Sequence, residues 1–458
     1  MVSTEMELYQ KNVLVVGLGK SGMAAARFLR SRGARVTASD AFGSGSADAV
    51  AELEQMGCLL ELGGHRMETF ENQDLIIVSP GVPHTIGPLC RAREKRIPVI
   101  GEIELASRFI QEPIVAITGT NGKTTTTTLV GEMLEASGMD VFVGGNIGRP
   151  LIEYVSGQPA DRVVVEISSF QLDTIEDFRP DVAVLLNISP DHLDRYAGMP
   201  AYAASKARIF KNQTLRDTAI LNGQDAWTLK FDEKIRARKL YFDGRKPGQP
   251  GADIKAGRLV LHLEDSNVRT VDLSEFKLVG RHNLENASAA CLASLAAGGS
   301  LEAVTAALNG FKGLAHRVQY AGSVCGVEFF DDSKATTVDS VKRALECFDR
   351  PVILIMGGLA KGCDFHDLSE PVRTRCKKIV VIGEAADEIG SVLGPVCPGG
   401  VEKAFTMEDA VAGAFSHAVS GDTVLLSPAC ASFDMFSGYA QRGERFCQAI
   451  QKLRAANQ

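Results

Sequence analysis

The sequence predicts an α/β protein in which mostly parallel, doubly wound sheets are divided among three domains. The 458-residue chain is long enough for about three domains. Short apolar runs alternate with helix-like segments from end to end, which is typical of parallel sheets with helical crossovers. Many of these runs end in glycine or polar residues, where α/β sheets place ligands. Restarts of the pattern near Gly101 and Gly313 predict domains at 1–101, 102–313 and 314–458.

Composition limits the classes of function. The net charge of -7 argues against broad nucleic-acid binding, and no apolar run approaches the roughly 20 residues that span a bilayer. The N-terminus is acidic and lacks the basic and apolar regions of a signal peptide. The ten cysteines show no C-x-x-C spacing. We therefore expect a cytoplasmic protein with reduced thiols, no nucleic-acid partner and no membrane association.

The first domain carries a glycine turn, G-L-G-K-S-G at 17–22, directly after an apolar run. A helical pattern over 23–32 follows, and the next apolar run ends at Asp40. Such a turn with an acid about twenty residues on is the dinucleotide-binding fingerprint, although the same turn suits any nucleotide diphosphate. A proline-stiffened loop, S-P-G-V-P, lies at a later strand end. The strands expected in this domain are 13–16, 35–39, 75–78 and 98–100.

The central domain contains T-G-T-N-G-K-T-T at 118–125, between an apolar run and an amphipathic helix that ends near Ser137. Glycines let backbone N–H groups turn inward, the helix N-terminus attracts negative charge, and Lys123 reaches the outer phosphates. The hydroxyl after the lysine can ligate Mg²⁺. The usual phosphate loop has an earlier glycine, which would fall at Ile117 here. The sequence therefore predicts a variant phosphate loop.

Polar, ligand-capable residues also follow later strands. In the central domain they form G-G-N-I-G, S-S-F-Q-L and N-I-S-P-D-H-L-D-R, and in the third domain D-D-S-K-A-T, G-G-L-A-K-G and S-P-A-C-A-S-F-D. The turn-rich segment 225–273, with short strands near Leu240 and Val260, predicts a small antiparallel insert, and a small-residue-rich helix opens in 280–287. The remaining expected strands are 114–117, 141–144, 163–167, 182–186, 327–330, 352–356, 378–382 and 423–426.

Together these motifs resemble the Mur ligase family over essentially the whole chain. The resemblance rests on the phosphate loop, E-I-S-S-F-Q-L, N-I-S-P-D-H-L-D-R, G-x-H-N-x-x-N, H-R, D-D-S-K-A-T and L-L-S-P-A-C-A-S-F-D. The last two are similar to the branch that joins D-glutamate to UDP-N-acetylmuramoyl-L-alanine. The family implies an N-terminal Rossmann-like uridine-nucleotide domain, a central P-loop ATPase-like domain and a C-terminal Rossmann-like domain that closes over the site. It also implies a monomeric cytoplasmic enzyme of peptidoglycan synthesis.

The resemblance implies a reaction that uses ATP. A carboxylate does not acylate an amine at neutral pH, because oxide is a very poor leaving group. Phosphorylation of the substrate's alanyl carboxylate would give an acyl phosphate, whose leaving group is phosphate. Attack by the amine of D-glutamate would then give an amide, ADP and phosphate. Phosphoryl transfer depends chiefly on positioning and on neutralisation of charge.

The resemblance assigns roles in this reaction to particular positions. Catalytic roles fall to Lys123, Glu166, His192, Lys206, Arg317 and Lys334. ATP contacts fall to Gly119, Thr120, Asn121, Gly122, Lys123, Thr124, Thr125, Asn283, Asn286, Arg317 and Asp332. Two Mg²⁺ sites are expected, with ligands from Thr124, Glu166, His192 and Lys206. Lys206 matches the family lysine that is carbamylated, which turns a cation into an anion able to bind metal.

The two other substrates have their own expected contacts. The UDP-substrate would be held by Gly17, Gly19, Lys20, Ser21, Gly22, Asp40, Asn146 and Arg149. D-Glutamate would be held by Thr336, Lys361, Ser432, Phe433 and Tyr439. The chain departs from better-known members after Asp40, where Ala41 and Phe42 stand in place of a frequent Thr-Arg pair. Phe42 is therefore a candidate to stack on uracil.

Three alternatives stay open at this point. Another amide ligase of the superfamily, such as a diaminopimelate-adding enzyme or a folylpolyglutamate synthetase, would share the phosphate loop, although the D-N-P-R motif of the former is absent. An NAD-linked dehydrogenase would account for the first glycine turn alone. A non-catalytic nucleotide-binding regulator would keep its biological activity without Lys123.

Overall fold

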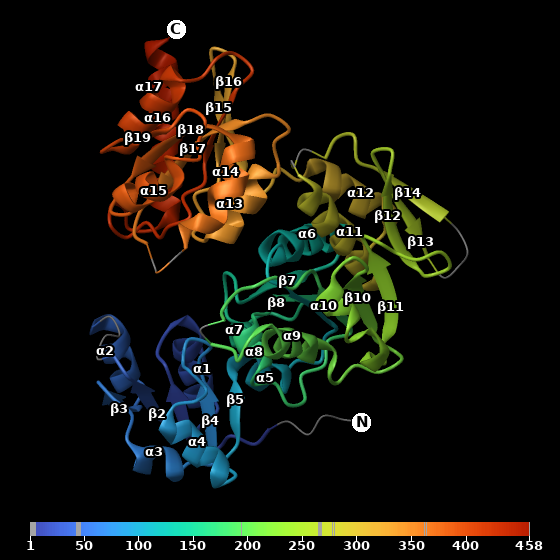
Figure 1. Cartoon of the computed structure of the whole chain (residues 1–458). Helices are drawn as coiled ribbons and strands as arrows, with labels where there is room; N and C mark the ends of the chain where they lie inside the picture. The colour runs from blue at the N-terminus through green and yellow to red at the C-terminus, as the bar shows by residue number, and fades with distance from the viewer. Residues whose placement is uncertain are drawn as a thin grey trace. The chain divides into compact units, whose positions relative to one another are not determined.

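A computed structural model describes residues 6–42, 47–193, 195–263, 268–276, 278, 280–360, 362 and 364–457. Contacts between residues divide the chain into two compact units. The first unit is Met1–Phe276 with Leu284–Phe311, and the second is Lys277–Asn283 with Lys312–Gln458. Two sheets belong to the first unit and one to the second, and helices flank each sheet (Figure 1). The α/β fold class predicted from the sequence is confirmed.

The N-terminal sheet has five parallel strands in the order β3-β2-β1-β4-β5. From β1 (Asn12–Val16) the chain builds outward to β2 (Arg35–Asp40), and then returns to the other side of β1 with β4 (Leu75–Val78). Ligands bind at such a switch in strand order in open α/β sheets. The other elements are α1 (Lys20–Ser31), α2 (Ala47–Gln55), β3 (Leu59–Leu62), α3 (Met67–Glu71), α4 (Gly87–Glu94), β5 (Val99–Gly101) and α5 (Glu102–Ser107).

The central sheet has nine strands in the order β14-β13-β12-β11-β10-β9-β6-β8-β7. It contains β6 (Ile114–Thr118), β7 (Val141–Gly145), β8 (Arg162–Glu166), β9 (Val182–Leu185), β10 (Thr218–Asn222), β11 (Arg238–Phe242), β12 (Gly251–Lys255), β13 (Arg258–His262) and β14 (Val268–Asp272). Its helices are α6 (Lys123–Ala136), α7 (Leu151–Val155), α8 (Ser169–Leu172), α9 (Met199–Ala207), α10 (Ala226–Leu229), α11 (Arg281–Ala296) and α12 (Leu301–Gly310).

The antiparallel part of this sheet is smaller than the expected insert. The strand at Leu240 is β11, which pairs in parallel with β10 and extends the main sheet. A helical crossover containing α10 joins these two strands, and such a connection produces parallel pairing. Only β13, with its neighbours β12 and β14, pairs in the antiparallel direction.

The second unit has a six-stranded sheet in the order β15-β16-β20-β17-β18-β19, and only the β15–β16 pair is antiparallel. The strands are β15 (Gln319–Val324), β16 (Val327–Asp331), β17 (Val352–Gly357), β18 (Cys376–Ile382), β19 (Val401–Lys403) and β20 (Thr423–Leu426). The helices are α13 (Val338–Leu345), α14 (Ser369–Arg375), α15 (Ala386–Leu393), α16 (Met407–Ser416) and α17 (Tyr439–Ala456).

The cores explain why the strands are uninterrupted apolar runs. Every residue of β4, β6 and β17 is buried, as expected for parallel strands covered by helices on both faces. In these three strands the chain therefore presents its polar, ligand-capable residues only after it leaves the core.

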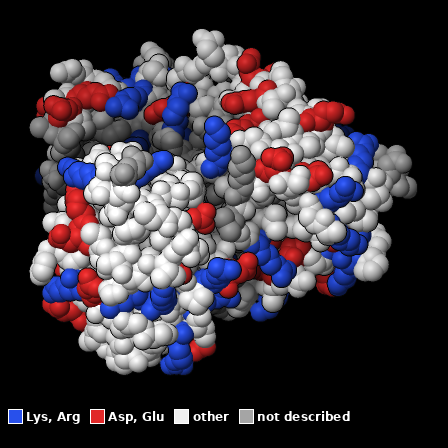
Figure 2. Space-filling model, turned by 90° about the horizontal axis from the view of Figure 1, so that it is seen from above, with Lys and Arg blue, Asp and Glu red and all other residues white. Residues whose placement is uncertain are grey.

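The surface carries mixed charge. On the face shown in Figure 2, Lys and Arg side chains of the described residues are interspersed with Asp and Glu side chains. Among the described residues, no helix combines the length and the apolar character needed to cross a bilayer.

Glu104 fixes the first helix after the N-terminal sheet to the central sheet. Its side chain is buried and accepts the backbone N–H groups of Glu176 and Phe178, each at 2.9 Å, and of Asp177 at 3.1 Å. Arg108 donates to the same carboxylate at 2.9 Å. Glu104 therefore pairs three consecutive amides of the turn before β9, and Arg208 and Asn212 bind carbonyls of the same turn.

We expect Glu104→Ala to lower the free energy of unfolding by about 2–4 kcal/mol, because buried N–H groups and part of an ion pair lose their acceptor. Urea denaturation of the full chain measures this change. Glu94→Ala is the matched control, since Glu94 is exposed and pairs with surface Arg91; its effect should stay below about 0.5 kcal/mol. Equal effects of the two substitutions would contradict the anchoring role.

Candidate active site

The phosphate loop lies between β6 and α6, as the sequence predicted. Ile117, at the place of the usual first glycine, pairs with Glu166 and Val184 in the sheet. The strand therefore continues through this position, and the turn begins later, at Gly119. Gly122 has φ +84°, and a side chain there would overlap Asn286. These two constraints explain why the loop has its variant spacing and a glycine before the lysine.

Asn187, just after β9, holds the loop in place. Its backbone carbonyl accepts the Thr120 N–H at 2.9 Å, and its side chain exchanges hydrogen bonds of 2.9 and 3.1 Å with the Asn121 backbone. The backbone N–H groups of Thr120 and Asn121 are therefore already paired within the site. An incoming phosphate would instead use the first turn of α6, because the N-terminus of a helix is a general anion-binding end. Asn187 opens the motif N-I-S-P-D-H, which did not by itself indicate this role.

Two lysine amines share one carbonyl oxygen in the loop. Lys123 Nζ donates to the carbonyls of Gly119 at 2.9 Å and Thr120 at 2.8 Å, and Lys206 Nζ donates to the same Gly119 carbonyl at 2.8 Å. Lys206 is only 2% exposed, and its amine lies 4.7 Å from the centre of the Tyr202 ring. Burial and then the charge of Lys123 lower the pKa of Lys206 well below its ordinary value. Both causes disfavour the charged form of this amine.

Glu166 presents a carboxylate oxygen without a partner to the same region. The side chain is 2% exposed, and Oε1 accepts from Asn146 Nδ2 at 2.8 Å. Oε2 is buried and has no hydrogen-bond partner among the described residues. A buried unpaired oxygen is costly, and a hard cation would satisfy it. Asn146, expected to contact the UDP-substrate, is placed where it orients this carboxylate.

His192 lies on the loop after β9 in a left-handed backbone conformation, with φ +53°. Its imidazole is 3.5 Å from the Asp191 carboxylate and contacts the rings of Phe170 and Tyr202. Tyr202 thus touches both His192 and Lys206, and its hydroxyl lies 3.2 Å from Thr120 Oγ1. Tyr202 links three predicted site residues and was not identified from the sequence.

The expected metal ligands are not all of one kind. Within the part of the chain that the structure describes, no group of three or more His, Cys, Asp and Glu side chains is arranged for a metal ion. A divalent cation at Glu166 would therefore depend on hydroxyl, phosphate or carbamate oxygens for its other ligands. The chemistry of Thr124 and of a carbamylated Lys206 fits that requirement.

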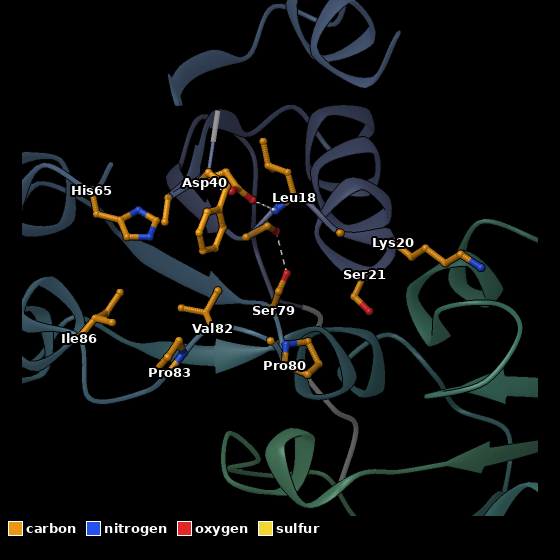
Figure 3. Close-up of a pocket in the computed structure, with 15 residues that line it drawn as sticks. Leu18, Lys20, Ser21, Asp40, His65, Ser79, Pro80, Val82, Pro83 and Ile86 are labelled. Carbon is orange, nitrogen blue, oxygen red and sulfur yellow. Dashed lines mark hydrogen bonds between the residues drawn. The ribbon is translucent and has the colours of Figure 1, made fainter. Parts of the chain in front are cut away.

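A pocket of about 480 Å³ opens at the switch point of the N-terminal sheet (Figure 3). The glycine turn forms one wall: Gly17 has φ +86°, and a side chain at Gly22 would overlap the Gly17 carbonyl. A side chain at Gly19 would meet nothing within 4 Å, so the backbone there is open to a ligand. The pocket is lined by Gly17, Leu18, Gly19, Lys20, Ser21, Asp40, Ala41, Phe42, His65, Ser79, Pro80, Gly81, Val82, Pro83 and Ile86.

Asp40, at the end of β2, lines this pocket and holds two of its loops together. Its carboxylate accepts the backbone N–H groups of Leu18 at 2.8 Å and Phe42 at 2.9 Å. The acid at the end of β2 therefore joins the glycine turn to the following loop. Phe42, the candidate stacking residue, is 78% exposed at the pocket.

A second pocket, of about 390 Å³, continues from the glycine turn and is rich in cations. It shares Leu18, Gly19 and Lys20 with the first pocket and adds Arg27 and Arg149. Figure 3 shows the Lys20 side chain directed away from His65 and Ile86, at the opposite side of the first pocket. The first pocket is therefore an apolar chamber and the second a cationic chamber, and residues of the glycine turn line both.

In the second unit, two adjacent acids fix the segment that carries Arg317. Asp331 is buried and bonds to His316 Nδ1 at 2.7 Å. Asp332 accepts from Ser427 Oγ at 2.8 Å and from the Val318 N–H at 3.3 Å, and burial raises its pKa to about 7. Arg317 lies between two residues of positive φ, His316 and Val318. Strained backbone of this kind is typical of functional loops.

Arg442 connects the loops that carry the predicted D-glutamate residues. It is fully buried and donates to the Ser333 hydroxyl and carbonyl and to the carbonyls of Gly357, Cys430 and Ala431. The predicted residues on or next to these loops are Lys334, Thr336, Ser432, Phe433 and Tyr439. Lys334 Nζ lies 5.1 Å from the centre of the Tyr439 ring.

Two predicted residues need separate mention. Lys361 lies outside the described residues. Asn283 lies one turn before Asn286 on α11, and the unit boundary falls between them.

Comparisons with known proteins agree with this arrangement. Family models match residues 11–101 as "Mur ligase MurD-like, N-terminal domain", 117–294 as "Mur ligase middle domain" and 316–430 as "Mur ligase, glutamate ligase domain". The chain is 50% identical to the UDP-N-acetylmuramoylalanine–D-glutamate ligase of Desulfosudis oleivorans, over 98% of each chain. It is 51% identical to the ligase of the same name from Desulfatibacillum aliphaticivorans, over 98% of this chain and 100% of that one.

Solved structures show the same fold at lower identity. The MurF ligase of Thermotoga maritima in complex with ADP matches with a TM-score of 0.59 at 18% identity, covering 100% of this chain and 98% of that chain. The UDP-N-acetylmuramate-alanine ligase MurC of Thermotoga maritima matches with a TM-score of 0.58 at 20% identity, covering 97% and 100%. With the family models and the half-identical relatives, these matches establish that the chain belongs to the Mur ligase family.

Proposed function

We propose that this protein is an ATP-dependent ligase that joins D-glutamate to UDP-N-acetylmuramoyl-L-alanine in peptidoglycan precursor synthesis. One observation carries the assignment: half of the residues are identical to ligases of that name over 98% of the chain. The reaction consumes ATP and gives an amide, ADP and phosphate. It proceeds through an acyl phosphate on the alanyl carboxylate, because that carboxylate needs a better leaving group than oxide.

The phosphate loop prepares the first step. The N-terminus of α6 and the amine of Lys123 neutralise the phosphates of ATP, while Gly122 lets the chain turn under them. Gly119, Thr120, Thr124 and Thr125 complete the cradle, and Asn283 and Asn286 face the adenine. Asn286 supports this role by its contact with the loop at Gly122. Arg317 and Asp332 are the residues of the second unit that we assign to ATP.

Glu166, Thr124, His192 and a carbamylated Lys206 would hold Mg²⁺ at two sites. Bound there, Mg²⁺ neutralises phosphate charge during transfer. The unpaired Glu166 Oε2 and the depressed pKa of Lys206 support this assignment. The amine of Lys206, once uncharged, attacks carbon dioxide and loses a proton, which leaves a carbamate anion beside Lys123.

The two substrates use the remaining pockets. The base of the UDP-substrate enters the apolar chamber, and the diphosphate meets the open backbone at Gly19 with Ser21 and Lys20. Arg149, in the cationic chamber, faces the sugar or the diphosphate. D-Glutamate carries two carboxylates, which we assign to Thr336, Lys361, Ser432 and the backbone at Phe433 and Tyr439. Lys334 neutralises charge on the transferred group.

The same family assignment bears on the alternatives. A dehydrogenase accounts for the first glycine turn but not for the phosphate loop or the matched glutamate ligase domain. We further propose that the protein acts as a monomer in the cytoplasm.

We expect phosphate release from ATP that requires both UDP-N-acetylmuramoyl-L-alanine and D-glutamate. Replacing D-glutamate with L-lysine should reduce the rate by at least about 10³-fold, because two carboxylate contacts are lost. Lys123→Ala should reduce turnover by a similar factor, because an amine beside the phosphates is removed. A phosphate-release assay measures each rate. Faster turnover with L-lysine, or full activity of the variant, would refute the assignment.

We also expect Lys206 to carry a carbamate at neutral pH. After incubation with ¹³C-bicarbonate, the protein should give one carbamate carbon resonance that Lys206→Met abolishes. Lys211→Met is the matched control, because Lys211 is an exposed lysine near the end of the same segment; it should keep both the resonance and the activity. Lys206→Met should lower activity by about 10²-fold or more. A resonance that survives Lys206→Met would place the modification elsewhere.

A further inference from the structure

His65 lines the apolar chamber at the switch point of the N-terminal sheet, where the proposed function places the nucleobase. The residue follows β3, whose position beside β2 was not predicted from the sequence. Figure 3 shows its imidazole directed into the pocket from the side opposite Lys20. The side chain is half-buried, so one part of the ring faces the sheet and another faces the pocket.

The ring is held from two sides. Nδ1 lies 2.7 Å from the hydroxyl of Ser39, a fully buried residue of β2. The ring of Phe70, also fully buried, meets the imidazole edge to face at a centroid distance of 5.6 Å. A ring fixed by two buried neighbours presents its remaining nitrogen, Nε2, in one direction.

The Ser39 contact also bears on which imidazole nitrogen carries the proton. The Ser39 hydroxyl donates to the Gly64 carbonyl at 3.4 Å. If the hydroxyl gives its one hydrogen to Gly64, it accepts from His65, and Nδ1 then carries the proton. Nε2 is then an acceptor, and it has no hydrogen-bond partner among the described residues.

We propose that His65 is the residue that reads the edge of the nucleobase and selects uracil over cytosine. This inference rests on the proposed function, because it concerns the uridine nucleotide of that substrate. N3 of uracil carries a hydrogen and can donate to Nε2. N3 of cytosine carries none and would place two acceptors against each other, which a buried site rejects. The apolar lining from Val82, Pro83 and Ile86 contributes area to binding but does not distinguish these bases.

Binding of nucleotides tests this role without requiring turnover. Titration calorimetry would compare UDP, 3-methyl-UDP and CDP on the full chain. The wild type should bind UDP about tenfold more tightly than either analogue, the effect of one hydrogen bond whose loss leaves a group unpaired. His65→Leu should reduce that preference to about twofold or less by weakening UDP. His65→Gln, which can place an amide oxygen near the position of Nε2, should keep most of it.

Controls separate the outcomes. ADP affinity should be unchanged in each variant, and His417→Leu, which removes a surface histidine paired with Glu402, should behave as wild type. If His65→Leu no longer binds ADP, the Ser39→Ala variant is used to test the role of His65. Without the Ser39 hydroxyl the proton on Nδ1 is no longer fixed, so the preference for UDP should fall by about threefold or more. Equal binding of UDP and 3-methyl-UDP by the wild type, or full preference in His65→Leu, would overturn the role of His65.

The role of His65 and the proposed ligase function can be contradicted independently of each other. A wild-type protein that distinguishes UDP from 3-methyl-UDP but joins no D-glutamate would retain base reading by His65 and lose the ligase assignment. If the protein joins D-glutamate but His65→Leu keeps the full preference for UDP, the ligase assignment stands and the role of His65 is wrong.

Discussion

The convergence of two lysine amines on the Gly119 carbonyl is the constraint on which the rest of the site depends. Two ammonium groups on one oxygen repel each other, and Lys206 is in addition almost wholly buried. Desolvation and the neighbouring charge both favour loss of its proton. In the proposed mechanism Lys123 serves the phosphates, while the buried amine of Lys206, whose charged form is disfavoured, is converted into a carbamate anion. Under this proposal, two identical side chains have opposite chemical roles.

The supporting residues show how this arrangement is kept rigid. Asn187 and Tyr202 hold the phosphate loop from the neighbouring strand end and from α9, and Asn146 orients Glu166. Each contact crosses between segments that lie far apart in the sequence. In the second unit Arg442 has the corresponding role, since five hydrogen bonds from one buried side chain connect three loops. Buried networks of this kind fix loop geometry when every member is satisfied.

Much of the fold could be predicted because strand and turn signals are local. The strands at Val13, Ile114 and Val352 are apolar runs that end in turn residues, and the structure has them within one or two residues. The strands β3, β10, β12, β14, β15 and β19 were missed because they are short or partly polar, and their pairing partners give them their conformation. The direction of β11 was misjudged for the same reason, since pairing is a long-range property.

The site could be predicted to the level of which segments take part. Motifs identified the loops, but the partner of a given side chain depends on contacts across the fold. Asp40, predicted to meet uracil or ribose, also ties two loops of the pocket through backbone amides, which the sequence did not indicate. Asn146, predicted to face the sugar or diphosphate, donates a hydrogen bond to Glu166, a contact that the sequence did not indicate. Asn187, Tyr202, His65 and Arg442 act through such contacts, so residue type alone could not single them out.

The most direct test of this account is whether the alanyl carboxylate is converted into a mixed anhydride with phosphate. Wild-type protein would be incubated with ATP, Mg²⁺, UDP-N-acetylmuramoyl-L-alanine and hydroxylamine, without D-glutamate. The account predicts a hydroxamate of the muramoyl substrate, formed with ADP and phosphate in equal amounts and absent when ATP is omitted. Formation of the D-glutamate product by an active protein that yields no hydroxamate under these conditions would contradict it.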